Sequence, residues 1–311
     1  MTSTADRTFS LQGKTVAVTG ASGMIGVYIC RSLLKAGAHV VGVVRNPAKA
    51  AFLATEGVEF RTADLNDPEA LTLAFKGCDA VVSNAAMYVA MKFLMATADH
   101  KKANVDGTRH VYESAHRAGV KRIVHISTFG VYKWWPLRTI NETTPQINGE
   151  RKQGGPYRAT KQISEAMAWQ FSASLGLDVT TLRPTAVFGA RDFNLLRTLY
   201  KFLKLPVLPL PSISLPFVYA GDVADAVTGA LRNDASIGHA YNVGGTMHQF
   251  SDVMKALVTA CGRGPRVLAL PLPVGLRVDN TKAERDIGFY SRPLSQAMAE
   301  IMAEDAPVFS A

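Results

Sequence analysis

Tyr157 and Lys161 are spaced so that they can act together on a proton, within the segment Tyr157-Arg158-Ala159-Thr160-Lys161. On a helix, this spacing places the phenol and the ammonium one turn apart on the same face. A free tyrosine, with a pKa of about 10, is a poor base at neutral pH, and a neighbouring cation favours the phenolate. The pair is therefore a candidate general acid/base that moves a proton to or from a substrate oxygen.

The chain contains two further pairs with this spacing: Tyr88/Lys92 and Tyr200/Lys204. Only Tyr157 opens a predicted helix after a long irregular segment, 133–156, and follows a strand that ends in the hydroxyl residues Ser127 and Thr128. The Thr128 hydroxyl can hold a substrate carbonyl oxygen beside the phenol. The alternative is a pair on a helix surface with no chemical role.

A glycine-rich turn, Thr19-Gly20-Ala21-Ser22-Gly23-Met24-Ile25-Gly26, follows the apolar strand pattern of residues 15–18. Gly20 permits a tight turn, Gly23 lets the backbone approach a pyrophosphate, and Gly26 lets helix and strand pack closely. The N–H groups at the start of the following helix favour phosphate charge. The expected dinucleotide contacts in this turn are Gly20, Ser22, Gly23, Met24, Ile25 and Gly26.

Arg45 stands about twenty residues after the glycines, directly after a predicted strand at 39–44, and Lys49 follows one helical turn later. NAD-binding units place an Asp or Glu at this point to hold the ribose 2′-hydroxyl. A carboxylate would repel a 2′-phosphate, whereas a guanidinium can bind it with two hydrogen bonds. The pattern predicts NADP(H) in preference to NAD(H); the alternative is that Arg45 only faces solvent.

Two more predicted strands end in residues suited to line the same cofactor. Asp64 and Leu65 follow the third strand, where Asp64 can accept a hydrogen bond from an adenine amino group or cap the next helix. Asp67 directly precedes Pro68 and is the better cap, which leaves Asp64 free. Asn84-Ala85-Ala86 follows the fourth strand, and its small side chains let the backbone lie against the cofactor.

The alternation of strand and helix patterns predicts an α/β fold, a doubly wound parallel sheet (Rossmann fold) with a smaller discontinuous C-terminal substrate lobe. Composition changes after Pro184, and residues 205–216 contain four prolines, too many for a regular element. The expected division is a cofactor-binding domain and a substrate lobe. The domain comprises residues 11–184 plus 217–243, and the lobe comprises residues 185–216 plus 244–311.

Composition excludes several classes of protein. The chain has 311 residues, 48% hydrophobic and 19% charged, and no apolar run approaches the ~18 residues of a membrane span. Its three distant cysteines and seven histidines show no disulfide or metal-ligand spacing, so no metal is expected. The polar N-terminus lacks the features of a secretory signal, and a cytoplasmic setting is expected.

The net charge of +9 is best explained by a solvated basic surface; the alternative is attraction for a polyanionic cofactor or substrate. The basic residues are spread along the chain, so nucleic-acid binding is not expected. No membrane partner is expected either.

Together these motifs resemble an extended short-chain dehydrogenase/reductase of the NAD-dependent epimerase/dehydratase superfamily. The motifs span nearly the whole chain: TGASGMIG at 19–26, Asp64-Leu65, Asn84-Ala85-Ala86, ISTFGVY at 126–132, YRATK at 157–161, RPTAVFG at 183–189, FVYAGDVADA at 217–226, YNVGG at 241–245 and TKAERDIGF at 281–289. The resemblance implies that Tyr157 is the general acid/base, Lys161 its partner and Thr128 the catalytic hydroxyl. It also implies that Asn104 supports a proton relay and that cofactor contacts include Ser127, Tyr157, Lys161, Pro184, Ala186 and Val187.

Departures from the superfamily pattern narrow the expected substrate. Phe129-Gly130 replaces the Asp-Glu that follows the catalytic Thr of sugar dehydratases, and Ala186 stands where nucleotide-sugar enzymes usually have Asn. The segment 44–49 is similar to the dihydroflavonol, cinnamoyl-CoA and aldehyde reductase branch. An apolar stretch at 87–95 is either a helix core or the wall of a substrate pocket. The hypothetical substrate contacts are Met87, Tyr88, Met91, Phe129, Trp134 and Trp135.

The leading expectation is an NADP(H)-dependent oxidoreductase that interconverts a ketone or aldehyde and an alcohol on a hydrophobic or aromatic small molecule. One alternative is a nucleotide-sugar 4-epimerase or reductase. Another is a non-catalytic NADP-binding sensor or scaffold, although such proteins typically lose the Tyr/Lys pair. A homodimer is expected from the resemblance alone.

Overall fold

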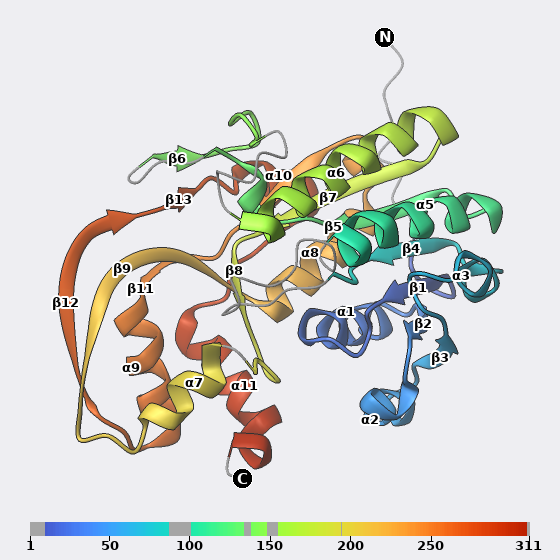
Figure 1. Ribbon diagram of the computed structural model, residues 1–311. Coiled ribbons are helices and arrows are strands. Elements are labelled where there is room, and N and C mark those ends of the chain that lie inside the picture. Colours follow the sequence, from blue (N-terminus) through green and yellow to red (C-terminus); the bar gives the residue numbers. More distant parts are fainter. Residues whose placement is uncertain (1–9, 87–100, 134–137, 148–154, 194, 310–311) are drawn as a thin grey trace.

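A seven-stranded parallel sheet forms the centre of the computed structural model, which describes residues 10–86, 101–133, 138–147, 155–193 and 195–309 (Figure 1). Its strands are β1 (Thr15–Thr19), β2 (His39–Val44), β3 (Glu59–Thr62), β4 (Ala80–Ser83), β5 (Arg122–Ile126), β7 (Asp178–Pro184) and β10 (Ala240–Val243). Their order is β3-β2-β1-β4-β5-β7-β10, and every pairing is parallel. This arrangement confirms the predicted doubly wound sheet.

Helices cover both faces of this sheet because its strands are apolar on both sides. Val16 and Val18 belong to the core beneath α1 (Met24–Lys35) and α8 (Ala220–Arg232). Ala17, between them, faces the opposite core, beneath the other helical layer. That layer contains α3 (Pro68–Phe75), α5 (Gly107–Arg117) and α6 (Gly155–Leu175). The period of two along β1 therefore supplies both helix–sheet interfaces.

Short elements connect these layers. They are η1 (Pro47–Ala50), α2 (Ala51–Thr55), the π-helical η2 (Lys101–Asp106), the 3₁₀ turns η3 (Phe129–Val131) and η5 (Asp234–Ser236), and α10 (Thr281–Ile287). Within its described residues, the predicted irregular segment 133–156 contains the short strand β6 (Thr139–Ile140), which pairs with β13 (Arg277–Val278), and the first two residues of α6. Among the described residues, no helix combines the length and apolar character needed to cross a bilayer.

A second, smaller sheet extends away from the first (Figure 1). Its strands are β8 (Ala186–Phe188), β9 (Val207–Tyr219), β11 (Met247–Gln249) and β12 (Arg266–Gly275). The accompanying helices are α7 (Leu195–Phe202), α9 (Phe250–Cys261) and α11 (Leu294–Phe309). β9 and β12 form a long curved ribbon, with α9 inside its bend.

β9 corrects the expectation that the proline-rich residues 205–216 form no regular element. It is a strand of 13 residues that contains three of the four prolines. Pro209 and Pro211 occupy alternate positions, so the N–H groups that they lack would point to the same edge of the strand. Among the described residues, β9 pairs over this stretch with β12 alone, while β11 pairs only from Ser214 onward. No described strand thus pairs with the other edge of β9 at Pro209 and Pro211, and prolines are tolerated at such an edge.

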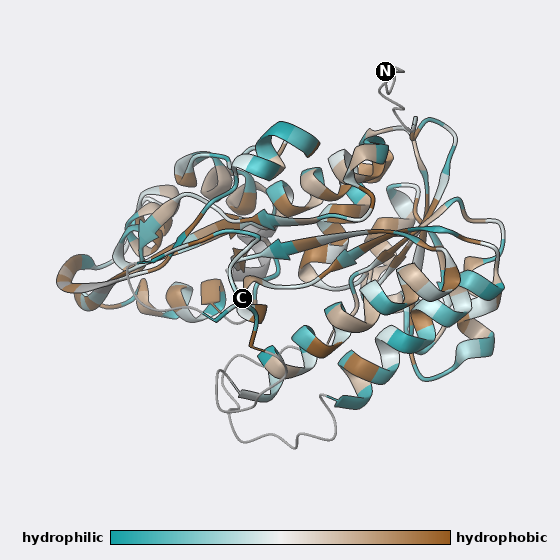
Figure 2. Ribbon diagram, turned by 90° about the horizontal axis from the view of Figure 1, so that it is seen from above, coloured by the Kyte–Doolittle hydropathy of each residue, from teal (hydrophilic) through white to brown (hydrophobic). Residues whose placement is uncertain are grey.

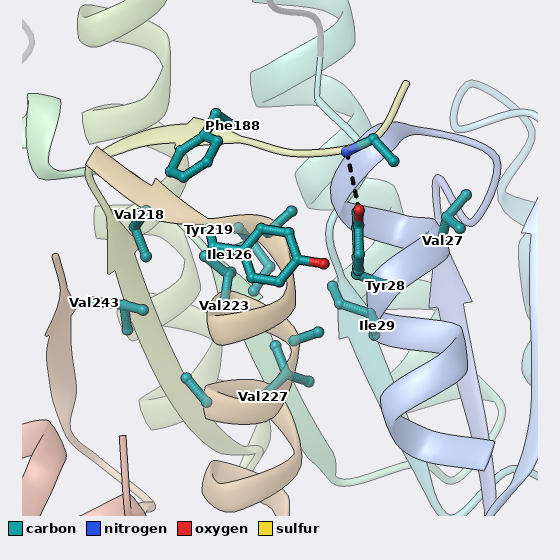
Figure 3. Packing of buried hydrophobic residues seen from close by; sticks show 14 of the residues in the cluster. Val27, Tyr28, Ile29, Ile126, Phe188, Val218, Tyr219, Val223, Val227 and Val243 are labelled. Atoms are coloured by element: carbon teal, nitrogen blue, oxygen red, sulfur yellow. Dashed lines mark hydrogen bonds between the residues drawn. The ribbon is translucent and has the colours of Figure 1, made fainter. Parts of the chain in front are cut away.

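The two sheets are joined through a buried aromatic contact (Figure 3). The Tyr28 hydroxyl, on α1, accepts a hydrogen bond from the Ala190 N–H at 2.9 Å. The Tyr28 ring meets the Tyr219 ring edge-on, with ring centroids 5.2 Å apart. β9 continues without a break across the predicted boundary between residues 216 and 217. The division into a cofactor domain and a substrate lobe stays a prediction.

Candidate active site

The glycine turn after β1 has the geometry of a phosphate cradle. Gly20 has a φ of +66°, a left-handed conformation that side chains other than glycine rarely adopt. A Cβ on Gly26 would lie 2.2 Å from the Gly20 carbonyl oxygen, so only glycine fits there. Gly23 is the N-cap of α1, and no acidic residue occupies the first turn. The helix N-terminus is therefore open to an anion, and this turn fits a dinucleotide.

The loop after β4 is fastened to the glycine turn. The Asn84 and Ala85 N–H groups donate to Thr19 Oγ1 at 3.0 and 3.1 Å, and Asn84 Nδ2 donates to the Thr19 carbonyl at 3.3 Å. Ala86, the next residue, is exposed. β1 and β4 are neighbours at the point where the strand order reverses. This is the crevice in which doubly wound sheets bind ligands.

Arg45, directly after β2, is held loosely. Its side chain is 81% exposed, and its Nη1 lies 4.0 Å from Asp64 Oδ2. Lys49, in η1, is also exposed. The guanidinium is consequently accessible to a ligand at the end of the sheet.

Asp64 and Leu65 occupy the loop after β3. Asp64 Oδ1 accepts hydrogen bonds from the Asn66 N–H at 2.8 Å and Nδ2 at 2.7 Å, and these bonds hold the pKa of Asp64 below its ordinary value. Asp67 caps α3 by accepting from the Ala70 N–H at 3.0 Å, which confirms the predicted cap. The Leu65 carbonyl accepts from His110 Nδ1 at 2.7 Å, which fixes this loop to α5.

Lys161 is buried beneath the end of β5. It lies on α6, one turn after the half-buried Tyr157, and its Nζ donates to the Ile126 carbonyl at 2.7 Å. Burial lowers the pKa of Lys161 from 10.5 to about 8, against the opposing effect of the Glu165 carboxylate. The ammonium is thus positioned where its charge is poorly screened by water.

Thr128 is the N-cap of η3, the turn to which Arg158 of α6 is hydrogen-bonded. Its Oγ1 accepts the Gly130 N–H at 3.2 Å, which leaves the hydroxyl hydrogen to donate elsewhere. Arg158, the neighbour of Tyr157, donates to the Gly130 carbonyl and the Tyr132 carbonyl, each at 2.6 Å. Arg158 and Lys161 together tie α6 to the segment that carries Thr128.

Asn104 lies on the other side of α6. It is buried in η2, and its Nδ2 donates to Thr160 Oγ1 at 3.2 Å. The Asn104 carbonyl accepts from Ser164 Oγ at 2.6 Å. π-Helical turns recur at functional sites. The Asn104–Thr160 hydrogen bond places Asn104 against the residue that precedes Lys161.

A buried polar network behind Lys161 was missed by the sequence analysis. Arg183, on β7, donates from Nε to both oxygens of Glu165, at 3.0 and 3.1 Å, and its Nη2 makes a further close contact with Oε1. Ser127 Oγ donates to Glu165 Oε2 at 2.5 Å. Arg183 Nη1 donates to the Tyr132 hydroxyl at 2.5 Å, which donates to Asn242 Oδ1 at 2.8 Å. All five residues are buried.

Two sequence features could have indicated this network. Glu165 lies four residues after Lys161 and eight after Tyr157, on the same face of the helix. Arg183 is a charged residue near the end of a strand that is otherwise buried, and a charge in such a place needs a partner. The pairing itself could not be read from either segment alone. The Ser127 hydroxyl donates to Glu165 and its N–H donates to the Leu182 carbonyl at 2.8 Å, so the role of Ser127 as a cofactor contact stays a prediction.

The remaining predicted residues divide into two groups. Pro184 is buried at the end of β7, Ala186 and Val187 are half-buried in β8, and Phe129 is half-buried in η3. The other predicted substrate residues lie outside the described part of the chain: Met87, Tyr88, Met91, Trp134 and Trp135. The catalytic and cofactor roles of all these residues stay predictions.

Known proteins share this sequence pattern and fold. The chain is 34% identical over 183 residues to sterol demethylase protein B of Methylococcus capsulatus, a match that covers 58% of this chain and 53% of that protein. It is 31% identical over 191 residues to cinnamoyl-CoA reductase 2 of Arabidopsis thaliana, with coverage of 58% and 56%. The chain thus spans about half the length of these curated relatives.

The solved structure of UDP-glucuronic acid 4-epimerase from Bacillus cereus in complex with NAD has the same fold. It superposes with a TM-score of 0.79 at 22% identity, over 95% of this chain and 99% of that one. The sequence model of the NAD dependent epimerase/dehydratase family matches residues 16–244, which include all of the central sheet except Thr15, the first residue of β1. The chain belongs to the NAD dependent epimerase/dehydratase family, whose members bind a nicotinamide cofactor.

Proposed function

We propose that this protein is an NADP(H)-dependent oxidoreductase that interconverts a carbonyl group and an alcohol on a hydrophobic or aromatic small molecule. The observation that carries the proposal is the buried Lys161 ammonium, held by the Ile126 carbonyl one helical turn from Tyr157. A buried cation beside a phenol serves proton transfer at an oxygen atom. A scaffold that only bound a dinucleotide would have no need for it.

In the proposed reaction, the chain's own residues handle the substrate oxygen. The Tyr157 hydroxyl donates a proton to that oxygen during reduction and accepts one during oxidation. The Thr128 hydroxyl donates a hydrogen bond to the same oxygen, and the Lys161 ammonium stabilises the phenolate left on Tyr157. The nicotinamide, when bound, supplies or accepts the hydride.

The proposed preference for NADP(H) depends on Arg45. Its guanidinium follows β2 and is largely exposed, and its carboxylate neighbour, Asp64, is 4.0 Å away. A 2′-phosphate bound at this point would meet an accessible planar cation able to make two parallel hydrogen bonds. Lys49 adds a second exposed cation to the same region.

Two features support a hydrophobic or aromatic substrate. One is the reductases among the relatives, and the other is Phe129, an apolar residue at the position where sugar dehydratases have Asp. The cinnamoyl-CoA reductase of Arabidopsis thaliana is a reductase by name. Phe129 follows Thr128 directly and packs against the small apolar cluster of Val131, Tyr132, Ile140 and Leu276. Nucleotide-sugar 4-epimerisation is the second candidate, favoured by the similar fold of the UDP-glucuronic acid 4-epimerase.

The test is oxidation of NADPH and of NADH, followed by absorbance, across aromatic and aliphatic ketones and aldehydes. We expect turnover that is faster with NADPH and with aromatic or long apolar compounds. Tight cofactor binding without net oxidation, together with interconversion of C4 epimers of a UDP-sugar, would identify an epimerase instead. Faster turnover with NADH would show that Arg45 does not bind a 2′-phosphate.

A further inference from the structure

The ribbon formed by β9 and β12 has two faces of different character. Leu208 and Leu210 point inward and belong to the main core. The alternate residues of β9, Val207, Pro209 and Pro211, are exposed. Because β9 pairs Pro209 with Leu268 and Pro211 with Leu270, these four residues lie on one face of the ribbon.

This outer face is apolar over several adjacent side chains. Val207 is 45% exposed, Leu268 41%, Leu270 54% and Leu272 46%. Figure 2 shows hydrophobic colouring along the outer bend of the chain at the left edge of the view, where Figure 1 places the ribbon. Single exposed apolar residues are ordinary, but a contiguous set on paired strands marks an interaction surface.

Positive charge accompanies the apolar face. Residues 193–221 and 253–278, which contain both strands, have no Asp or Glu. Lys201, Lys204, Arg263 and Arg266 are exposed, and the Arg266 N–H donates to the Pro206 carbonyl at 2.9 Å, which places the start of β12 beside that of β9. Lys204, Arg263 and Arg266 therefore lie near one end of the apolar face. Within the described part of the chain, none of these four cations forms an ion pair.

We propose that the outer face of the β9–β12 ribbon docks on the surface of an anionic lipid bilayer. Apolar side chains next to unpaired Lys and Arg match the apolar interior and negative headgroups of such a surface. A second copy fits less well, since a symmetric contact would bring the same cations together with no carboxylate from these segments to oppose them. The absence of a membrane partner was expected because no segment could span a bilayer, but docking at the surface needs no span.

Docking and catalysis are separable because the ribbon face contains none of the proposed catalytic or cofactor residues. Docking would also hold the protein near the phase in which hydrophobic compounds concentrate, a point that rests on the proposed function. The docking proposal itself depends only on the surface of β9 and β12. Loss of docking and loss of turnover can therefore be measured independently.

The experiment is co-sedimentation of the full chain with phosphatidylcholine vesicles that contain or lack phosphatidylglycerol, at low and at high salt. We expect binding to the anionic vesicles that weakens with salt, as for basic surface segments. Leu270→Glu should weaken this binding at least about tenfold, because it puts a carboxylate in the apolar face. Leu73→Glu is the matched control, since Leu73 is 69% exposed on α3, away from the ribbon.

Two further variants and a light-scattering measurement of oligomeric state distinguish membrane docking from misfolding and from dimerisation. Lys204→Glu should weaken binding and reduce its salt dependence, and Leu268→Ser replaces Leu270→Glu if circular dichroism shows that the latter does not fold. The proposal is wrong if the wild-type chain ignores anionic vesicles, binds neutral ones equally well, or keeps its affinity in the folded ribbon variant. It is also wrong if light scattering without vesicles shows a dimer that Leu270→Glu dissociates.

Discussion

The two ends of the central sheet hold their polar residues in opposite ways. At the β5–β7 end, Lys161, Glu165 and Arg183 are buried. Lys161 donates to the Ile126 carbonyl at 2.7 Å, and Arg183 Nε donates to Glu165 Oε1 at 3.0 Å. At the β2–β3 end, the Arg45 side chain is 81% exposed, and its Nη1 lies 4.0 Å from Asp64 Oδ2, at the outer limit of an ion pair. Both ends lie on the carboxyl edge of one parallel sheet, where ligands of this fold bind.

The contrast suggests that the buried residues near β5 and β7 serve proton transfer, whereas the exposed Arg45 after β2 serves cofactor choice. Proton transfer needs a phenol and a cation held in fixed positions, and buried hydrogen bonds restrain α6 against β5 and β7. Discrimination between cofactors needs only a charge within reach, and an exposed side chain provides it at little cost to stability. Substitutions at the first end should therefore affect both folding and turnover, whereas those at the second should affect cofactor choice alone.

The largest effect is expected for Tyr157→Phe. It removes the proposed proton donor and keeps the ring, so kcat should fall by roughly 10³-fold or more. Cofactor affinity, measured by fluorescence titration, should change little. Tyr200→Phe is the matched control, since Tyr200 lies on α7 and belongs to another Tyr-x-x-x-Lys pair in the sequence. Turnover by Tyr157→Phe close to that of Tyr200→Phe would disprove the proposed role.

Arg183→Met should produce the next largest effect, on stability. It leaves the buried Glu165 carboxylate without its cation, a change that typically costs about 3–5 kcal/mol. Urea denaturation should show this loss, whereas Arg45→Met should change the free energy of unfolding by less than ~0.5 kcal/mol. Similar stabilities of the two variants would remove the contrast between the two ends of the sheet.

Arg45→Ser should act on the cofactor. Loss of a charge-assisted contact with a 2′-phosphate is expected to raise the KM for NADPH by about 10- to 100-fold, or ~1.5–3 kcal/mol. The KM for NADH and the kcat should stay within about twofold, since Arg45 lies at the other end of the sheet from Tyr157. An equal rise in both KM values would mean that Arg45 supports the fold of this region and does not read the phosphate.

The smallest effect is a change in the pH dependence of stability. Because burial lowers the pKa of Lys161 from 10.5 to about 8, the unfolded chain binds more protons than the folded one between these pH values. The unfolding free energy of the wild type should therefore rise with pH relative to Lys161→Met, by about 1 kcal/mol per pH unit near pH 9. Lys49→Met, at an exposed position, should follow the wild type. A flat difference between wild type and Lys161→Met would show that the amine is not buried.

The sequence predicted what depends on local pattern. Gly20 and Gly26 could be assigned from spacing because their backbone requirements arise within one turn. Lys161 could be paired with Tyr157 because both lie on one helix. The strands of the central sheet were predictable from their apolar runs for the same reason.

Contacts between distant segments were not predictable in this way. Glu165 and Arg183 come together only when α6 packs on β7, and no periodicity relates them. The prolines of β9 argued against a strand in the sequence. Whether a strand tolerates them depends on which of its edges is paired, and that is decided by the distant strand β12. The ion pair and the strand both depend on a distant partner segment. Local secondary-structure propensity therefore predicts the strand wrongly and does not predict the ion pair at all.

The unbroken course of β9 limits how the two sheets can move. A single strand runs from Val207 to Tyr219 and leads directly into α8, which begins at Ala220. Hinges need a few residues free to change φ and ψ, and a hydrogen-bonded strand followed at once by a helix offers none. Rotation of one sheet against the other at this junction would bend β9 itself. The central sheet and the base of the ribbon should therefore tilt as one body, and access to the crevice would be governed by loops rather than by a swing of the ribbon.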